Sequence, residues 1–110
     1  EGDAQCLGIF PTQVRRLAAV PEQGIKVPHM GWNSLADLRT PLFDGIAPGA
    51  FVYFVHSYAA APCDATIALC NNGADFSAAL HRDNFYGVQF HPEKSGDVGA
   101  RIIDNFLTKI

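Results

Sequence analysis

The segment Phe85-Tyr86-Gly87-Val88-Gln89-Phe90-His91-Pro92-Glu93 leads directly into residues 95–109, and this stretch decides the fold class. Residues 85–90 are apolar and predict a strand that ends at the His-Pro-Glu sequence. Residues 95–109 predict a helix with Ser95 as its N-cap and one buried face, because apolar residues recur at positions 98, 102, 103, 106 and 107. The order strand, turn, helix indicates an α/β protein, in which sites lie just beyond the carboxyl ends of strands.

Upstream of this segment the sequence predicts a run of strands. The strongest is residues 51–58, Phe-Val-Tyr-Phe-Val-His-Ser-Tyr, which has no polar alternation before His56 and therefore suits a strand buried on both faces. The other expected elements are strands at 12–17, 25–32, 66–70 and 76–81, a turn at 21–24, one or two helical turns at 33–40, and a loop at 41–49.

Length and composition exclude several classes of protein. We expect residues 1–110 to belong to a single domain, and 48% apolar with 17% charged residues is a globular composition. A formal charge of -3 argues against a nucleic-acid surface, which needs a basic patch. The most apolar stretch, residues 46–61, is interrupted by Pro48, Gly49 and His56, so no membrane span is expected.

The three cysteines, Cys6, Cys63 and Cys70, form no CxxC pair, and their odd number favours a reducing compartment, which we take to be the cytoplasm. Cys6-Leu7-Gly8 looks like part of a nucleophile elbow, but an elbow requires a strand before it and a helix after it. Only five residues precede Cys6 and Pro11 follows it, so we expect a structural or surface cysteine. Cys63 and Cys70 are expected to be packed.

The histidines at positions 29, 56, 81 and 91 lack the spacing of zinc ligands, so neither a metal site nor a cofactor is expected. His91 and Glu93 are different, because residues two apart in an extended segment face the same way. A carboxylate beside an imidazole orients the ring and stabilises its protonated form, as a general base requires. Spacing alone favours a solvated loop, whereas the helix start that follows favours a cleft at the strand end.

Two further groups of residues have both a structural and a functional interpretation. His56-Ser57-Tyr58 ends the strongest strand, where a core histidine satisfied by the backbone is the simpler interpretation and a polar lip beside His91 the functional one. Residues 28–33, Pro-His-Met-Gly-Trp-Asn, hold the chain's only tryptophan and methionine. They predict either a buried tryptophan beside a turn at Gly31 or a docking surface.

Together these residues resemble a known family. Phe90-His91-Pro92-Glu93 after an apolar strand resembles the His-Pro-Glu signature of class I (triad) glutamine amidotransferases. Residues 26–33 (KVPHMGWN), 53–58 (YFVHSY) and 84–96 (NFYGVQFHPEKSG) are together similar to the glutaminase subunits of imidazole glycerol phosphate synthase, an enzyme of histidine biosynthesis. The resemblance extends from about Gly8 to Phe106 and implies an α/β, flavodoxin-like layered sheet, here strand-rich and ending in a helix.

The resemblance implies a Cys-His-Glu triad that hydrolyses glutamine to glutamate and releases ammonia. By position, His91 is expected to be its base and acid, and Glu93 the partner that orients His91. Ser57 and Tyr58 are expected to contact glutamine through their backbone. The ammonia would pass to a (β/α)8-barrel cyclase subunit that forms imidazole glycerol phosphate. Trp32, Asn33, Tyr53 and Lys94 are expected at the interface with that subunit.

The chain departs from the family in one large respect, because the Gly-x-Cys-x-Gly-x-Gln nucleophile elbow is absent. We therefore expect residues 1–110 to be the C-terminal portion of one amidotransferase domain, inactive alone. The missing half would supply the central parallel strands. Its absence predicts uncovered apolar faces and self-association of the fragment.

Two other hypotheses remain at this point. The chain could be a non-catalytic module that docks a partner through the surface around Trp32. The missing nucleophile is consistent with this hypothesis. It could also belong to an amidotransferase of another pathway that shares the His-Pro-Glu signature, although residues 28–33 argue against this.

Overall fold

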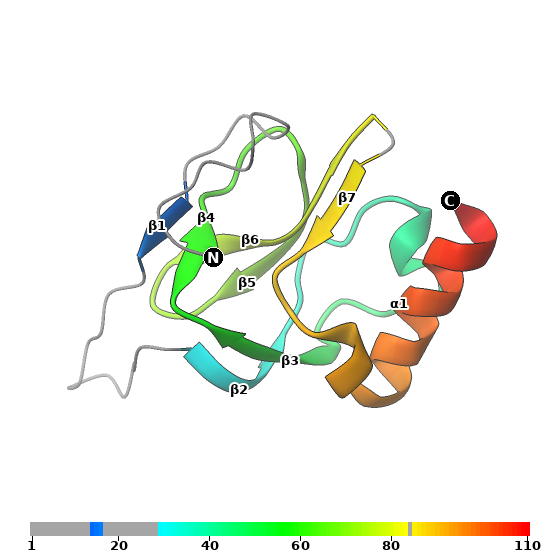
Figure 1. The fold of residues 1–110 in the computed structure, drawn as a ribbon, viewed down its shortest axis with the longest axis horizontal. Helices are drawn as coiled ribbons and strands as arrows, with labels where there is room; N and C mark the ends of the chain where they lie inside the picture. Colours follow the sequence, from blue (N-terminus) through cyan, green and yellow to red (C-terminus); the bar gives the residue numbers. More distant parts are fainter. Residues whose placement is uncertain (1–13, 17–28, 84) are drawn as a thin grey trace.

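The computed structural model describes residues 14–16, 29–83 and 85–110. One sheet has the order β1 (Val14–Arg16), β4 (Tyr58–Ala60), β6 (Asp75–Arg82) and β5 (Thr66–Asn71), with β7 (Phe85–Val88) also paired to β6. A second sheet pairs β2 (His29–Ser34) with β3 (Phe51–His56). All strand pairs among the described residues are antiparallel. Helix α1 (Gly96–Lys109) stands on the side of the molecule opposite β1 and β4 (Figure 1).

The predicted strands at 66–70 and 76–81 are confirmed by β5 and β6, which form a hairpin. The strand expected at 51–58 is also present, but it breaks at Ser57, where the chain passes from β3 to β4. The prediction that it is buried on both faces was wrong. Val52, Phe54 and His56 are buried, whereas Phe51 is exposed and Tyr53 and Val55 are only half-buried. The outer face is therefore apolar without being covered.

The core lies between the two sheets and α1. Phe54 is fully buried at its centre, in edge-to-face contact with Phe76 and Phe90 at centroid distances of 5.6 and 6.0 Å. Leu42 and Phe43 of the 3-10 helix η2 (Pro41–Phe43) and Ile102 of α1 complete one continuous cluster with it. Phe90, the residue immediately before His91, is thus anchored in the core.

The helical turns expected at 33–40 are absent, and that prediction was wrong. Backbone amides there bond to residues far away in the sequence. Leu35 N–H donates to Ala50 O, just before β3, and Arg39 N–H donates to Ile67 O in β5, at 2.9 and 2.8 Å. Asp37 and Thr40 have positive φ angles of 53° and 75°, which a right-handed helix does not allow. Within the expected loop at 41–49, η2 forms one short helical turn.

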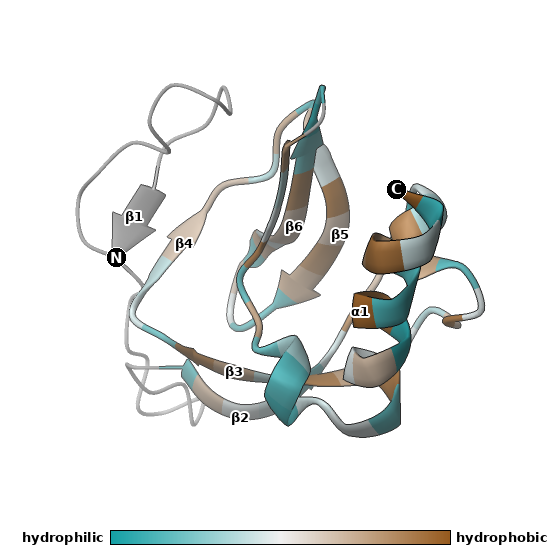
Figure 2. Cartoon of the chain, turned by 45° about the vertical axis from the view of Figure 1, so that its right-hand side comes forward, coloured by the Kyte–Doolittle hydropathy of each residue, from teal (hydrophilic) through white to brown (hydrophobic). Residues whose placement is uncertain are grey.

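Helix α1 confirms the helix predicted at 95–109 and part of its buried face, since Ile102 is buried and Val98 packs against the core. Gly99, Ile102 and Asn105 are buried, while Ile103, Phe106 and Leu107 are 41 to 72% exposed. Asn105 Nδ2 donates to Leu42 O and Asp44 O at 2.9 Å each, which ties the helix to η2 and the residue after it. Figure 2 shows apolar colouring that continues along α1 as well as along β3 and β5.

Several predictions fall partly or wholly outside the described residues. They are the turn at 21–24, the placement of Cys6, and the ends of the strands expected at 12–17 and 25–32. Within the described residues those two strands are β1 and β2, and β7 ends at Val88, two residues before the predicted end of its strand. No helix of the described part has both the length and the apolar character that crossing a membrane requires.

Candidate active site

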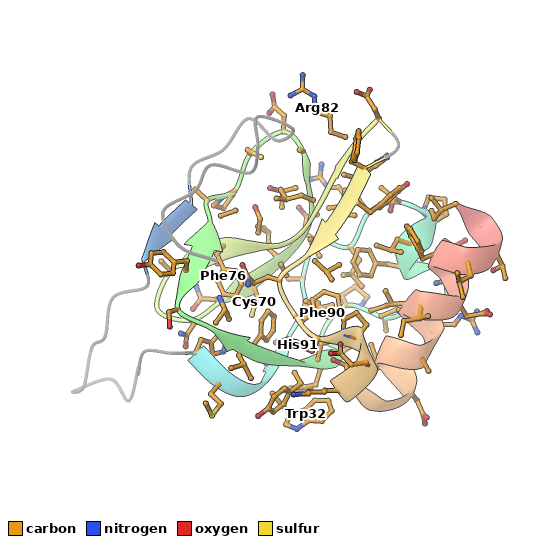
Figure 3. The ribbon with its side chains drawn as sticks, viewed as in Figure 1. Trp32, Cys70, Phe76, Arg82, Phe90 and His91 are labelled. Atoms are coloured by element: carbon orange, nitrogen blue, oxygen red, sulfur yellow. The ribbon has the colours of Figure 1, made fainter. Side chains whose placement is uncertain are left out.

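His91 stands at the edge of β3, held there through its backbone. Its N–H donates to Tyr53 O at 2.9 Å, in the middle of the strand. The preceding Phe90 is 3% exposed and is locked in the aromatic core. The chain after His91 turns at once into the 3-10 helix η3 (Pro92–Lys94). His91 is therefore placed by a buried anchor on one side and a tight turn on the other (Figure 3).

His91 and Glu93 lie side by side as expected, but not in an extended segment, because Glu93 lies within the 3-10 helix η3. His91 Nδ1 and Glu93 Oε2 are 3.2 Å apart, and their side chains are 38% and 60% exposed. Because a carboxylate can only accept, Nδ1 carries the proton and Nε2 of the neutral ring keeps a lone pair. A hydrogen bond from its own backbone amide, then its interactions with His91, hold the pKa of Glu93 below the usual value. This arrangement gives an accessible, oriented imidazole that can accept and return a proton.

Ser95 supports this pair in a way that the sequence did not reveal. It precedes α1 as predicted, but its side chain makes no cap hydrogen bond to the helix. Instead its Oγ donates to His91 O at 2.6 Å and accepts from Tyr53 N–H at 2.9 Å. With 1% of its surface exposed, Ser95 links β3, His91 and the helix start. A serine before a helix resembles an ordinary cap, so no sequence signal distinguishes this role.

Gly99 allows α1 to approach η3 closely. A Cβ atom on Gly99 would lie 1.9 Å from Pro92 O, which is far inside any real contact. Pro92 lies between His91 and Glu93 in the chain. The lack of a side chain at Gly99 therefore determines how closely the helix packs against the turn that carries the candidate pair.

The outer face of the β2–β3 sheet is apolar and starts beside His91. We call this surface the β2–β3 outer face; its members are Met30, Trp32, Phe51, Tyr53 and Val55. Trp32 pairs with Tyr53 across the strands and packs edge-to-face on its ring at 5.9 Å. Met30 and Trp32 are 63% and 54% exposed. The alternative of a buried tryptophan was therefore wrong, and the geometry suits a docking surface.

The other predicted residues lie around this centre at different positions. Lys94 is in η3, and its N–H donates to His91 O at 3.0 Å. Asn33 has its side chain bonded inward, donating to Asn71 O at 2.9 Å. Ser57 and Tyr58 are half-buried and lie further along the chain from Tyr53, where β3 passes into β4. His91, Glu93, Tyr53 and Lys94 are thus brought together, whereas Ser57 and Tyr58 lie beyond the end of β3, with Tyr58 at the start of β4.

The described cysteines do not provide a nucleophile next to His91. Cys70 is buried, as predicted, and burial raises the pKa of its thiol to about 12, which disfavours the reactive thiolate. Cys63 is half-buried in the loop before β5 and accepts a weak hydrogen bond from Thr66 Oγ1 at 3.8 Å. Within residues 29–83 and 85–110, three or more potential metal ligands do not cluster anywhere.

Comparison with known proteins places the chain among amidotransferases. A family model described as glutamine amidotransferase class-I matches residues 6–110. A Shewanella loihica protein named imidazole glycerol phosphate synthase subunit HisH is 54% identical, covering 96% of this chain and 46% of its own length. Proteins of the same name from Bacteroides fragilis and Haemophilus influenzae are 54% and 44% identical, over 97% and 100% of this chain and 54% of their own lengths. The chain therefore spans about half the length of the curated relatives it matches.

A solved structure supports the fold independently. A crystal structure of a Thermoplasma acidophilum protein, described as belonging to a GMP synthase, superposes with a TM-score of 0.66. It covers 89% of this chain and 48% of its own length at 20% identity, so the likeness shows the fold alone. Together with the family model, it confirms the expected α/β class I amidotransferase fold.

Proposed function

Since the chain belongs to the class-I glutamine amidotransferase family, we propose that it is part of a glutaminase that supplies ammonia to a cyclase subunit in histidine biosynthesis. The relatives named imidazole glycerol phosphate synthase subunit HisH support this choice of pathway. The observation that carries the catalytic proposal is the oriented His91–Glu93 pair at the edge of β3, 3.2 Å apart and open to solvent.

We propose that residues 1–110 form the C-terminal portion of one amidotransferase domain. The roughly half-length match to the relatives supports this, as does an apolar groove of about 210 Å³ beside α1. Its lining residues are Leu42, Tyr86, Val88, Pro92, Ile103, Phe106 and Leu107. In this proposal the remainder of the domain covers the groove and carries the nucleophilic cysteine.

The proposed chemistry assigns His91 one proton transfer in each direction. His91 Nε2 takes the proton of the cysteine thiol, and the thiolate adds to the side-chain amide carbon of glutamine. The imidazolium returns that proton to the departing nitrogen, so ammonia leaves and a glutamyl thioester remains. His91 then takes a proton from water, whose oxygen displaces the thiolate. That proton returns to the sulfur as glutamate departs. Glu93 stabilises the imidazolium in both halves.

Substrate and partner contacts complete the proposal. The backbone of Ser57 and Tyr58 would hold glutamine, just beyond the end of β3, the strand that also positions His91. The β2–β3 outer face, with Lys94 beside His91, would face a (β/α)8-barrel cyclase subunit, with Asn33 at its margin. Two exposed apolar anchors, Met30 and Trp32, are of the kind that dominate protein interfaces. Exposed apolar surface of this kind also supports self-association of the isolated chain.

A second function also calls for a test, because the same outer face fits a docking module without catalysis. The experiment measures ammonia and glutamate released from glutamine by the complete domain containing this chain, with and without the barrel cyclase. Stoichiometric release with the cyclase supports the glutaminase. Binding to the cyclase without any release would support the docking module. Release without binding to the barrel cyclase would support an amidotransferase of another pathway.

A further inference from the structure

A buried pair of histidines lies behind the β2–β3 sheet, outside the His91–Glu93 pair. His29 and His56 are register partners at one end of the sheet, and they are 8% and 2% exposed. His29 Nδ1 and His56 Nε2 are 2.9 Å apart. The rings of Phe54 and Phe76 surround them, with His29 stacked on Phe54 at 4.9 Å. The mechanism proposed above uses neither histidine.

The hydrogen bonds of this pair fix both tautomers. His56 Nδ1 lies 2.9 Å from Tyr58 O, and a carbonyl can only accept, so Nδ1 of His56 must carry a proton. In the neutral ring Nε2 then accepts, and His29 Nδ1 must be its donor. The remaining nitrogen, His29 Nε2, faces Asn33 Nδ2 at 3.4 Å. The result is one chain of bonds that all run in the same direction and end at Tyr58 O.

The amide of Asn33 is itself oriented by the structure. Its Oδ1 accepts from Ser34 N–H at 2.8 Å and its Nδ2 donates to Asn71 O at 2.9 Å, so the nitrogen is on the side of His29. Burial first, and then His56, lower the pKa of His29 to about 4. His29 is therefore neutral near pH 7, as the chain of bonds requires.

The chain of bonds ends at Tyr58 O, in the backbone proposed above to hold glutamine. β3 stops at His56 and β4 starts at Tyr58, so Ser57 is the corner where the backbone leaves one sheet for the other. A side chain that bonds the carbonyl two residues further on closes this corner. We propose that His56, held in one tautomer by His29, is a positioning residue that fixes the Ser57–Tyr58 backbone for glutamine. This inference rests on the proposed function and adds specific residues to it.

Two substitutions of His56 separate this role from simple packing. His56→Asn keeps an amide donor near the position of Nδ1 and so retains the bond to Tyr58 O. His56→Gln places its amide near the position of Nε2 and loses that bond. In the complete glutaminase with its cyclase, His56→Gln is expected to raise the glutamine KM about five-fold with little change in kcat, the effect of about one hydrogen bond. His56→Asn should keep a KM close to that of the wild type.

An equal KM in both variants and the wild type would overturn the proposal. So would equal losses of kcat and thermal stability in both variants, which would indicate packing alone. A second measurement does not depend on activity. In the full chain, nitrogen NMR of the imidazoles should show both rings neutral and protonated at Nδ1. A ring protonated at Nε2 or doubly protonated near neutral pH would contradict the inference even if glutamine hydrolysis is observed. If hydrolysis is absent while both tautomers are as stated, the glutaminase proposal fails and the hydrogen-bonded corner stands.

Discussion

At the scale of single residues, the exposed His91–Glu93 pair and the buried His29–His56 pair have opposite environments. His91 is accessible and bonded to a carboxylate that orients its ring. His29 is enclosed by aromatic rings and bonded to a second buried imidazole, His56. Burial lowers the pKa of His29, whereas His91 stays open to solvent beside its carboxylate partner. The environment rather than the residue type therefore separates a proton carrier from a structural link.

Glu93→Gln tests how much His91 depends on its partner. The amide cannot stabilise the imidazolium and can present a donor to Nδ1, which favours the wrong tautomer. We expect the rate of glutamine hydrolysis in the complete enzyme to fall about 100-fold or more, with the unfolding midpoint unchanged because the side chain is exposed. A rate close to that of the wild type would remove Glu93 from the proposed mechanism.

The lowered pKa of His29 predicts a loss of stability in acid. The folded ring has a pKa of about 4, against an ordinary 6.5, so the unfolded chain binds more protons between these values. The free energy of unfolding should therefore keep its maximum contribution from His29 above pH 6.5. It should decrease by about 3 kcal/mol as the pH drops toward 4. Urea unfolding of the wild type and of His29→Asn across this window provides the measurement. A difference between the two proteins that stays constant with pH would contradict the assignment.

At the scale of elements, the seating of α1 on η3 positions the candidate base. Replacing glycine by alanine inside a helix normally stabilises it by roughly 1 kcal/mol. At Gly99 we expect the opposite sign, a loss of about 2 kcal/mol, because the new methyl group would overlap Pro92 O. Asp104→Ala, an exposed change in the same helix, is the matched control and should change stability little. Chemical denaturation measures both, and stabilisation by Gly99→Ala would refute this account of the seating.

Ser95→Ala should also cost more than the loss of an ordinary helix cap. The change removes the donor to His91 O and the acceptor for Tyr53 N–H, both at a position with almost no solvent access. We expect a loss of about 2 to 3 kcal/mol in unfolding free energy and lower activity of the complete enzyme. Thr108→Ala removes a single exposed hydrogen bond in the same helix and is the control. Similar small losses in both variants would show that Ser95 is not a link between elements.

How far the sequence could predict these elements depends on where the partners of each residue lie. The periodicity of residues 95–109 indicated a helix, because it depends on local geometry. The spacing of His91 and Glu93 allowed their pairing, but the two residues meet through the 3-10 helix η3 and not in the extended segment that was expected. The burial of Ile102 was predicted, but that of Asn105 was not, since Asn105 docks through a hydrogen bond to Leu42, 63 residues away in the sequence. The apolar outer side of β3 was interpreted as buried because hydrophobicity does not distinguish a core from an interface. The roles of Ser95 and the His29–His56 pair depend on bonds across 42 and 27 residues of sequence.

At the scale of the whole molecule, two separate apolar surfaces are exposed among the residues that the structure describes. One is the β2–β3 outer face, and the other is the groove beside α1 that includes Phe106 and Leu107. In the proposed assembly the first meets the cyclase and the second meets the rest of the domain. Trp32→Ala should therefore weaken cyclase binding without unfolding the chain, whereas a charge in the groove should act within the domain.

Leu107→Glu tests the groove. The leucine is 72% exposed in this chain, so the substitution should leave the stability of the isolated chain nearly unchanged and reduce its self-association. In the complete domain, where we propose that the groove is covered, the same charge should destabilise by about 2 kcal/mol or more. Sedimentation and chemical denaturation of both proteins give the comparison. Equal small effects in the two contexts would show that the groove stays open.

The measurement that tests the central proposal most directly is ammonia release from glutamine by the complete protein with its cyclase and cyclase ligand, comparing wild type with His91→Asn. The account predicts release by the wild type and a loss of at least about 100-fold in the variant, with the fold intact by circular dichroism. Equal release by the two proteins would place the base elsewhere and reduce the His91–Glu93 pair to an exposed loop after a strand.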